Sequence, residues 1–214
     1  MLQEKLEVYF IMGSTNCLKS PQETLKSAIQ GGITIFQFRE KGPGSLEGED
    51  KLRLAKELQA ICQQSHIPFL VNDDIDLAVK INADGLHIGQ DDENLKTVRE
   101  RLPDKIIGIS THTMEEVKSA IAEGADYLGI GPVYATTTKK DTKTVQGTKL
   151  IKELREASIS IPLVGIGGIT EKNAEAVVRA GANGVSIITA ISKSQTPSKA
   201  AELLKAAVKA GKRG

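Results

Sequence analysis

The sequence lacks tryptophan, and it has only two cysteines, three histidines and 3% aromatic residues in 214 positions. So few rings offer little surface on which bases could stack, and a net charge of +1 provides no basic stripe for a phosphate backbone. Nucleic acid is therefore not expected as a partner. Cys17 and Cys62 form no CxxC motif, and the histidines have no zinc-type spacing, which indicates ordinary thiols in a reducing compartment.

Long hydrophobic segments are also absent. No apolar run approaches the ~18 residues that suggest a membrane span. The first ten residues, MLQEKLEVYF, carry early charges, and no apolar core with a cleavage site follows them. We therefore expect a cytoplasmic protein that does not enter a membrane. With 40% hydrophobic and 26% charged residues, the chain is expected to form one globular domain over residues 1–214.

The dominant pattern is an alternation of short β-branched segments with longer segments of helical periodicity. Strands are predicted at 8–12, 33–38, 68–71, 85–88, 106–109, 127–130, 162–166 and 184–187. Helices are predicted near 21–30, 49–64, 74–81, 93–101, 114–123, 147–157, 171–180 and 197–210. Eight βα units of roughly 27 residues each have the size of a compact repeating unit. They predict an α/β protein with a closed (β/α)8 TIM barrel.

Local motifs support this division of the chain. Ser20-Pro21-Gln22-Glu23 has the form of a capping box with proline at the first helical position. A degenerate repeat has Asp84, Asp126 and Asn183 at equivalent positions and predicts a helix end, a tight turn and a strand entry. An open doubly wound sheet is the competing architecture. Its usual Gly-x-Gly-x-x-Gly fingerprint does not follow the first predicted strand.

Charged side chains follow the second, third and fourth predicted strands, at the ends where barrels carry their function. Alternation places Gln37, Arg39 and Lys41 on one face, and an amide with two cations suits a polyanion. The next two strands end in Asn72-Asp73-Asp74 and in His87-Ile88-Gly89-Gln90-Asp91-Asp92. Carboxylates from neighbouring strand ends are hard oxygen ligands suited to Mg²⁺. We therefore expect a magnesium site with one carboxylate from each cluster.

Some of these residues have a structural alternative. Asp is common at helix starts, so Asp74 and Asp91 are candidates for caps or for solvent-facing side chains as well as for metal ligands. His87 lies within a predicted strand and is expected to be packed and hydrogen-bonded rather than to act as a general base. His112 lies just past the fifth predicted strand and is a candidate for acid–base work or for a helix cap.

A second set of anion-binding features follows the sixth, seventh and eighth predicted strands. The segment Gly131–Asp141 is long for its position and combines three threonines with two lysines, which suits phosphate. Gly165-Ile166-Gly167-Gly168 allows backbone amides to approach a phosphate, and the loops after the last two strands are the recurrent phosphate site of this fold. Two anion-binding halves, one with a metal, fit two phosphorylated small-molecule substrates, one of them a diphosphate.

Taken in order, these motifs resemble the thiamine phosphate synthase (thiamine-phosphate pyrophosphorylase) family over nearly the whole chain. The resemblance implies a (β/α)8 barrel that joins 4-amino-5-hydroxymethyl-2-methylpyrimidine diphosphate to 4-methyl-5-(2-phosphoethyl)thiazole, yielding thiamine phosphate and pyrophosphate. It implies Mg²⁺ as the cofactor. It also implies that the bond to pyrophosphate breaks early and that the thiazole nitrogen captures the resulting cation, so the protein supplies no nucleophile.

Roles for individual residues carry over from the family by motif position. The resemblance implies that the pyrimidine diphosphate is bound by Gln37, Arg39, Lys41, Asn72, Ser110 and Lys139. It implies that the thiazole phosphate is bound by Thr136, Thr138, Gly168, Ile188 and Thr189. Arg39, Lys41, Ser110 and Lys139 are the implied catalytic residues, and Asp73 and Asp92 the implied metal ligands.

The sequence departs from the family pattern in two places. Ala135 stands where many members have proline, and the first strand ends in Met12-Gly13-Ser14 where Thr-Asp is common. Neither departure touches an assigned residue.

Three other functions compete with this one. A thiazole tautomerase-like barrel would use a histidine such as His112, but it has no need of the Asp73 and Asp92 pair. A Schiff-base aldolase would need a lysine in an apolar pocket within a strand. Neither Lys41 nor Lys139 is expected in the middle of a strand. A non-catalytic barrel that binds thiamine metabolites would not need a complete set of metal ligands and cations. The oligomeric state stays open, a homo-oligomer included.

Overall fold

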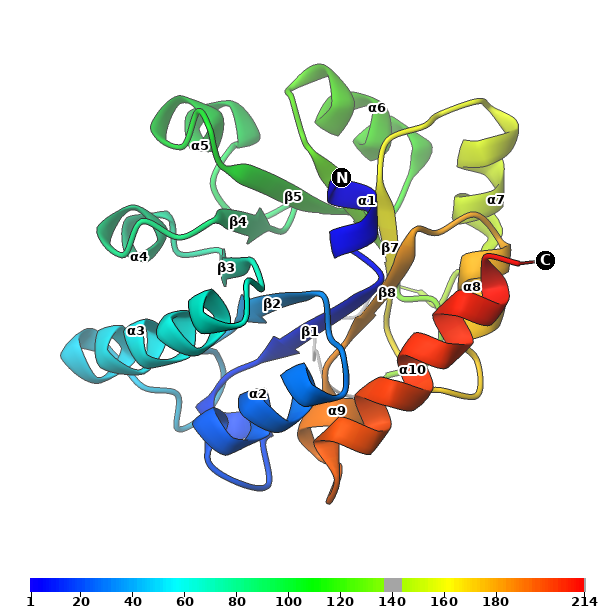
Figure 1. Ribbon diagram of the computed structural model, residues 1–214. Helices are drawn as coiled ribbons and strands as arrows, with labels where there is room; N and C mark the ends of the chain where they lie inside the picture. The colour runs from blue at the N-terminus through cyan, green and yellow to red at the C-terminus, as the bar shows by residue number, and fades with distance from the viewer. Residues whose placement is uncertain (137–143, 214) are drawn as a thin grey trace.

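The computed structural model describes residues 1–136 and 144–213, and its centre is a closed barrel of eight parallel strands. The strands follow one another around the barrel in chain order, and β1 pairs with β8 to close it (Figure 1). They are β1 (Val8–Met12), β2 (Ile35–Phe38), β3 (Phe69–Asn72), β4 (Gly85–Ile88), β5 (Ile106–Thr111), β6 (Tyr127–Ile130), β7 (Leu163–Ile166) and β8 (Gly184–Ile187). The predicted (β/α)8 barrel is confirmed.

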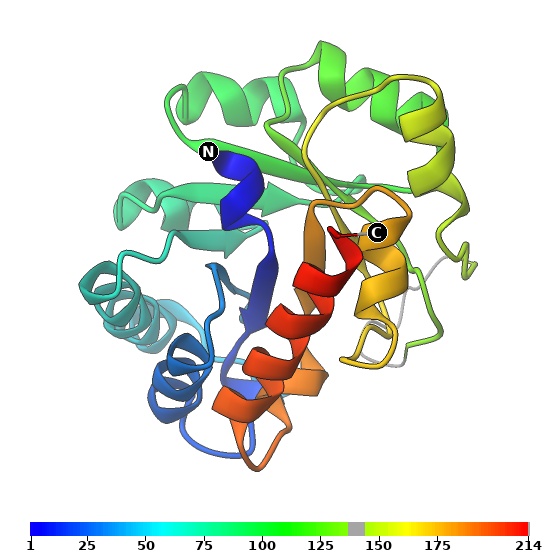
Figure 2. The ribbon, with the colours of Figure 1, turned by 45° about the vertical axis from the view of Figure 1, so that its right-hand side comes forward.

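Helices surround the barrel and connect successive strands. They are α2 (Pro21–Gln30), α3 (Gly48–Gln64), α4 (Ile75–Lys80), α5 (Leu95–Arg101), α6 (Met114–Ala122), α7 (Lys149–Glu156), α8 (Ala174–Arg179) and α10 (Pro197–Gly211). The last of these, α10, packs between α2 and α8 on the outside of β1, as Figure 2 shows. No helix among the described residues combines the length and apolarity needed to cross a bilayer.

Three short elements were not predicted. They are α1 (Leu2–Lys5), the 3₁₀ turn η1 (Ser14–Asn16) and α9 (Thr189–Ser192). Each has three or four residues, which is too short for a helical hydrophobic period to be visible in the sequence. The first, α1, leads into Leu6, which is fully buried and packs with side chains inside the barrel.

Strand side chains alternate between two hydrophobic clusters. In β1, Val8, Phe10 and Met12 pack outward against the helices, whereas Tyr9 and Ile11 belong to the cluster inside the barrel. This period of two is what a strand with both faces covered requires. The same alternation, continued past the end of a strand, determines which of the following residues point toward the barrel axis.

The degenerate repeat has a structural role at the amino ends of the strands. In each copy a side-chain oxygen accepts a hydrogen bond from a backbone amide of the preceding strand. The pairs are Asp84 with Phe69 at 2.8 Å, Asp126 with Ile107 at 2.8 Å and Asn183 with Leu163 at 2.9 Å. Arginines reinforce two of them, because Arg99 bonds Asp126 at 2.7 Å and Arg155 bonds Asn183 at 3.2 Å. These contacts tie neighbouring strands together away from the carboxyl ends.

We predict that Asp126→Ala lowers the free energy of unfolding by about 1–2 kcal/mol, because the Ile107 amide and Arg99 both lose a partner. Urea denaturation followed by circular dichroism measures the change. Asp104→Ala, which removes an exposed carboxylate, is the control and should leave stability within about 0.5 kcal/mol. Equal stability of the two variants would show that the repeat does not stabilise the barrel.

Candidate active site at the carboxyl ends of the strands

A cavity of about 720 Å³ opens at the carboxyl ends of the strands. Its walls come from the ends of β2 to β8 and the loops that follow them. Ten of the predicted site residues line it: Arg39, Lys41, Asn72, Asp73, Asp92, Ser110, Thr136, Gly168, Ile188 and Thr189. The predicted Thr138 and Lys139 lie outside the described residues. Closure of the barrel therefore brings together residues from both halves of the chain.

Gln37 is placed elsewhere. It faces the barrel interior like Arg39, but it lies inside β2, and its side chain is buried below the large cavity. Its Nε2 donates a hydrogen bond to the Tyr9 hydroxyl at 2.7 Å. It lines a separate cavity of about 10 Å³ together with His87 and Ser186. Alternation correctly predicts that Gln37 and Arg39 share a face of the strand. It does not specify how far along the barrel axis each side chain lies, and so does not show that Gln37 lies below the cavity.

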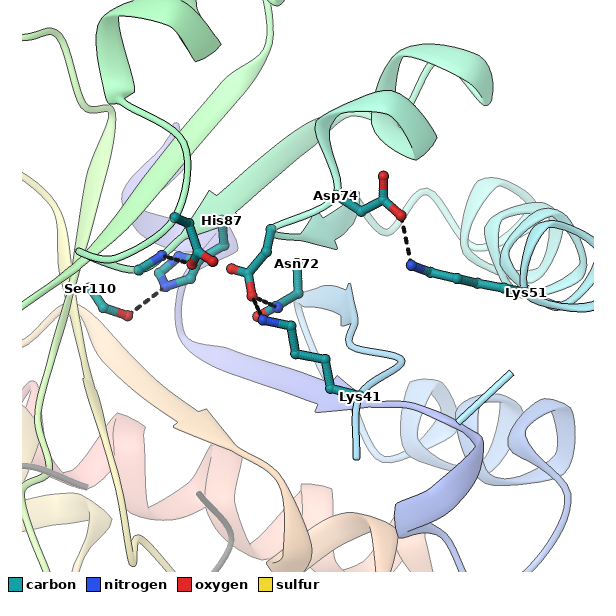
Figure 3. A network of polar contacts seen from close by, with 9 residues as sticks. Lys41, Lys51, Asn72, Asp74, His87 and Ser110 are labelled. Atoms are coloured by element: carbon teal, nitrogen blue, oxygen red, sulfur yellow. Dashed lines mark hydrogen bonds and ion pairs between the residues drawn. The ribbon is translucent and has the colours of Figure 1, made fainter. Parts of the chain in front are cut away.

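A compact polar cluster occupies the side of the cavity next to β3 and β4. The Lys41 ammonium pairs with the Asp73 carboxylate, and Asn72 Nδ2 donates to Asp73 Oδ2 at 2.6 Å. Figure 3 shows Lys41 reaching toward Asn72 at this point. The neighbouring Asp92 carboxylate accepts the Gly89 amide at 2.7 Å. Both predicted metal ligands are thus oriented by neighbours at the ends of adjacent strands.

The two carboxylates influence each other. Burial, followed by the adjacent Asp73 carboxylate, raises the pKa of Asp92, while the Gly89 amide and Lys41 act in the opposite direction. Burial lowers the pKa of the Arg39 guanidinium, and the negative charges of Asp73 and Asp92 offset part of that effect. Two like charges held together in a partly buried site favour a cation between them.

The donor chemistry of this cluster fits Mg²⁺, which takes hard oxygen ligands and commonly uses one or two carboxylates together with phosphate oxygens and water. Within residues 1–136 and 144–213 no group of three or more histidine, cysteine or acidic side chains has the arrangement of a metal site. Asp73 and Asp92 therefore fit an ion whose remaining ligands come from a bound phosphate, and they do not form a complete protein cage.

Asp74, next to this cluster, has a structural role. Its Oδ1 accepts the Leu77 amide at 2.9 Å as the N-cap of α4, and its Oδ2 binds Lys51 at 2.6 Å (Figure 3). Of the roles considered for Asp74, the structure shows the helix cap. Asp91 differs, since it is exposed at the edge of the cavity.

Both histidines under consideration line the cavity, and both have hydrogen-bond partners. His112 Nδ1 lies 3.0 Å from a Glu116 carboxylate oxygen, which also accepts the His112 amide at 2.6 Å. His87 is buried between Tyr127 and Ser110, at 2.8 and 3.0 Å. His87 is therefore packed and hydrogen-bonded, as the sequence predicted.

A buried carboxylate that sequence reasoning missed holds the loop carrying the two cations. Glu40 accepts the Ser14 and Leu46 amides at 2.8 and 2.9 Å and also the Ser14 hydroxyl. It thereby joins the loop after β1 to the segment that contains Arg39 and Lys41. The position of Glu40 between the two cations in the sequence does not indicate these partners.

Two further residues at the site carried no assigned role. Gln90 Nε2 donates to the Ser110 carbonyl at 2.7 Å and so fixes the end of β5. Lys193 lines a second cavity of about 760 Å³, which shares Thr136, Gly168 and Thr189 with the first. Gln90 lies in the His87–Asp92 motif, whereas no sequence pattern distinguishes Lys193 from other exposed lysines.

The opposite wall is built from glycines and hydroxyls. Gly167 and Gly168 have positive φ angles of 101° and 61°, and a Cβ on Gly168 would lie 2.4 Å from the Ala135 carbonyl oxygen. Only glycine allows the loops after β6 and β7 to approach so closely. Ile188 and Thr189 begin α9 beside them. This wall presents backbone amides and hydroxyls, which suit a phosphate.

Barrel and cavity together define the class of protein. A closed (β/α)8 barrel whose mouth combines paired carboxylates, cations and a glycine-lined wall is an enzyme fold equipped for phosphorylated small molecules.

Comparison with known proteins identifies the family. The family model for thiamine monophosphate synthase matches residues 8–191. Thiamine-phosphate synthases from Bacillus cereus and Bacillus thuringiensis are each 58% identical to the chain over 195 residues, covering 91% of this chain and 89% of theirs. The solved structure of a thiamine phosphate pyrophosphorylase from Pyrococcus furiosus superimposes with a TM-score of 0.88 at 32% identity, covering 99% of both chains. The chain belongs to the thiamine monophosphate synthase family, which confirms the resemblance seen in its motifs.

We predict that Asp73→Asn lowers the pKa of Asp92. The substitution removes the neighbouring negative charge and frees Lys41 to interact with Asp92, and both changes favour the ionised carboxylate. Carboxyl ¹³C NMR titration measures this pKa, with the resonance assigned by its loss in Asp92→Asn. Asp74→Asn is the matched control, because Asp74 binds Lys51 and should leave the Asp92 titration unchanged. An unaltered Asp92 pKa in Asp73→Asn would contradict the coupling.

Proposed function

We propose that the 720 Å³ cavity is the active site of a thiamine-phosphate synthase, a transferase that condenses 4-amino-5-hydroxymethyl-2-methylpyrimidine diphosphate with 4-methyl-5-(2-phosphoethyl)thiazole. The observation that carries the proposal is the meeting of two anion-binding walls at one mouth. The cluster around Asp73 and Asp92 faces the same cavity as Thr136, Gly168 and Thr189. Membership in the family supplies the reaction, and the two walls provide for its two phosphorylated substrates.

The pyrimidine diphosphate belongs at the charged wall. Asp73 and Asp92 would hold Mg²⁺ there, and the bound ion would neutralise part of the charge that collects on the departing pyrophosphate. Arg39 and Lys41 bind the diphosphate oxygens and stabilise the same developing charge. Lys139, which lies outside the described residues, is proposed for the same role. Asn72 keeps Asp73 oriented through its 2.6 Å hydrogen bond.

The thiazole phosphate belongs at the glycine wall. The hydroxyls of Thr136 and Thr189 donate hydrogen bonds to it, and the amides near Gly168 and Ile188 complete the set of donors. Thr138 is proposed as a further donor and lies outside the described residues. This binding holds the thiazole nitrogen beside the pyrimidine methylene carbon, so that two molecules react as if they were one.

Both the bond that breaks and the bond that forms belong to the substrates. The C–O bond to pyrophosphate breaks with its electron pair leaving on the pyrophosphate, and the thiazole nitrogen supplies the pair for the new C–N bond. The protein therefore needs no nucleophile, and its task is to stabilise charge and to position both substrates. An enzyme that only isomerises the thiazole phosphate has no use for the cations and carboxylates of the charged wall.

The direct test mixes the purified protein with both substrates and Mg²⁺ and follows thiamine phosphate by chromatography. Product is expected, and a chelator such as EDTA should abolish its formation until Mg²⁺ is restored. Failure to form product would reject the proposed reaction. Product formation that is indifferent to EDTA would reject the role of the metal.

We expect Asp73→Asn to lower kcat by about 10²–10³, because a site with one carboxylate fewer would hold Mg²⁺ poorly, and losing one group that stabilises a developing charge typically costs that much. Asp74→Asn changes the adjacent residue in the same way but outside the cavity, and asparagine still caps α4. Its kcat should stay close to that of the unmodified protein. Similar rates for the two variants would contradict the assignment of Asp73.

Thr136→Val should raise the KM for the thiazole phosphate roughly tenfold, because one hydroxyl donor to a charged phosphate is lost. The KM for the pyrimidine diphosphate should stay within about twofold. Thr97→Val changes an exposed threonine on α5 and serves as the control for the assay. A rise in the KM for the pyrimidine diphosphate instead would place Thr136 at the wrong substrate.

A further inference from the structure

A continuous row of polar side chains crosses the inside of the barrel below the cavity. Gln37 Nε2 donates to the Tyr9 hydroxyl at 2.7 Å, and the Tyr9 hydroxyl lies 2.7 Å from that of Tyr127. The Tyr127 hydroxyl lies 2.8 Å from His87 Nδ1, and His87 Nε2 lies 3.0 Å from Ser110 Oγ. The row links β2, β1, β6, β4 and β5 and ends at the cavity wall, as Figure 3 shows for His87 and Ser110.

Polar side chains are an unusual filling for this space, since the interior of such barrels is mostly packed with branched apolar residues. The five side chains are at most 9% exposed. Burying a hydroxyl or an imidazole costs free energy unless it is hydrogen-bonded, and here each finds its partner in the row. Because each side chain in the row depends on the next for its hydrogen bond, losing one member would leave its neighbours buried without a partner.

The sequence provides room for the row through two glycines in neighbouring strands. A Cβ on Gly108 would lie 2.0 Å from Cζ of Tyr127 and 2.4 Å from its hydroxyl oxygen. A Cβ on Gly129 would lie 3.2 Å from Cε1 of His87. Gly108 has no positive φ angle, so the Tyr127 ring, and not backbone conformation, explains why position 108 has no side chain.

The amide at one end sets the direction of the protons. The Gln37 NH₂ group can only donate, so the Tyr9 oxygen accepts there and its own proton is available for Tyr127. When Tyr9 donates to Tyr127, the Tyr127 proton is directed to His87 Nδ1 as its acceptor, and a neutral imidazole with that acceptor carries its proton on Nε2. The Nε2–H group donates to Ser110 Oγ. Burial raises the pKa of both phenols, so they keep these protons at neutral pH.

We propose that Gln37, Tyr9, Tyr127 and His87 form a relay of positioning residues that holds the His87 proton on Nε2 and so directs the Ser110 hydroxyl to donate into the cavity. With its oxygen occupied by His87, Ser110 has its own proton free for an acceptor on the bound substrate, such as a pyrimidine ring nitrogen. The relay gives Gln37 an indirect role in place of the direct contact that motif position implies. The substrate part of this inference rests on the proposed function, whereas the tautomer does not.

The first test reads the tautomer without any substrate. In ¹⁵N-labelled full-length protein, long-range ¹H–¹⁵N correlation should show His87 with a protonated Nε2 and an unprotonated, hydrogen-bonded Nδ1. His87→Gln identifies the signal by its loss. Tyr127→Phe should convert it to a mixture of tautomers, whereas Thr24→Val, which removes a buried hydroxyl in α2, should not change it. A proton on Nδ1 in the unmodified protein would overturn the relay.

The second test asks whether the relay reaches the reaction. Tyr127→Phe should lower kcat about 3- to 10-fold, the effect of one hydrogen bond, with the KM for the thiazole phosphate unchanged. His87→Gln, whose amide can still donate to Ser110, should retain more activity than the apolar His87→Met. This pair keeps the inference testable if Tyr127→Phe does not fold. Equal activity of His87→Gln and His87→Met would show that His87 serves packing alone.

The two tests separate two kinds of failure. A protein that makes no thiamine phosphate but shows the Nε2 tautomer retains the relay and loses the proposed function. An active protein with the other tautomer retains the function and loses the relay.

Discussion

Pairing of β1 with β8 is the constraint on which the site depends, because it turns a row of strands into a ring. In a ring the ends of β2, β3 and β4 and those of β6, β7 and β8 line one cavity of about 720 Å³. The same side chains on an open sheet would lie along a line, with the charged wall and the glycine wall far apart. The chemistry therefore follows from closure as much as from the residues.

The two ends of the barrel are organised for different purposes. At the amino ends, charges are paired with backbone groups, as where Arg99 and Asp126 bind both each other and neighbouring strands. At the carboxyl ends, Asp73 and Asp92 are held close enough for one to raise the pKa of the other. Placing like charges together costs stability, and the Lys41 ammonium beside Asp73 offsets part of that cost.

Periodicity predicted the fold well because each strand is covered on both faces. The bounds of β1, β4, β6 and β8 agree with the prediction, whereas β2 begins at Ile35 rather than at residue 33. There the Thr34 amide donates to the Val8 carbonyl at 2.9 Å, but the Val8 amide donates to the Thr34 hydroxyl and not to a backbone carbonyl. The helices α1 and α9 were not predicted because four residues are too few to show the hydrophobic periodicity of a helix.

Predicting the site was harder, because its partners are far apart in the chain. Alternation put Arg39 and Gln37 on one face, but only the packed barrel shows that Gln37 lies one layer lower, against Tyr9. Helix-start chemistry explains Asp74, whereas Glu40 gains its role from loops that the sequence does not join.

The fit between Gly108 and the Tyr127 ring limits how the barrel interior can diverge. No side chain can be added at position 108 while the ring occupies that space. A smaller residue at position 127 would leave a void that a side chain at 108 could fill. Positions 108 and 127 should therefore change as a pair among descendants of this sequence, and libraries that redesign the interior need to vary both codons at once.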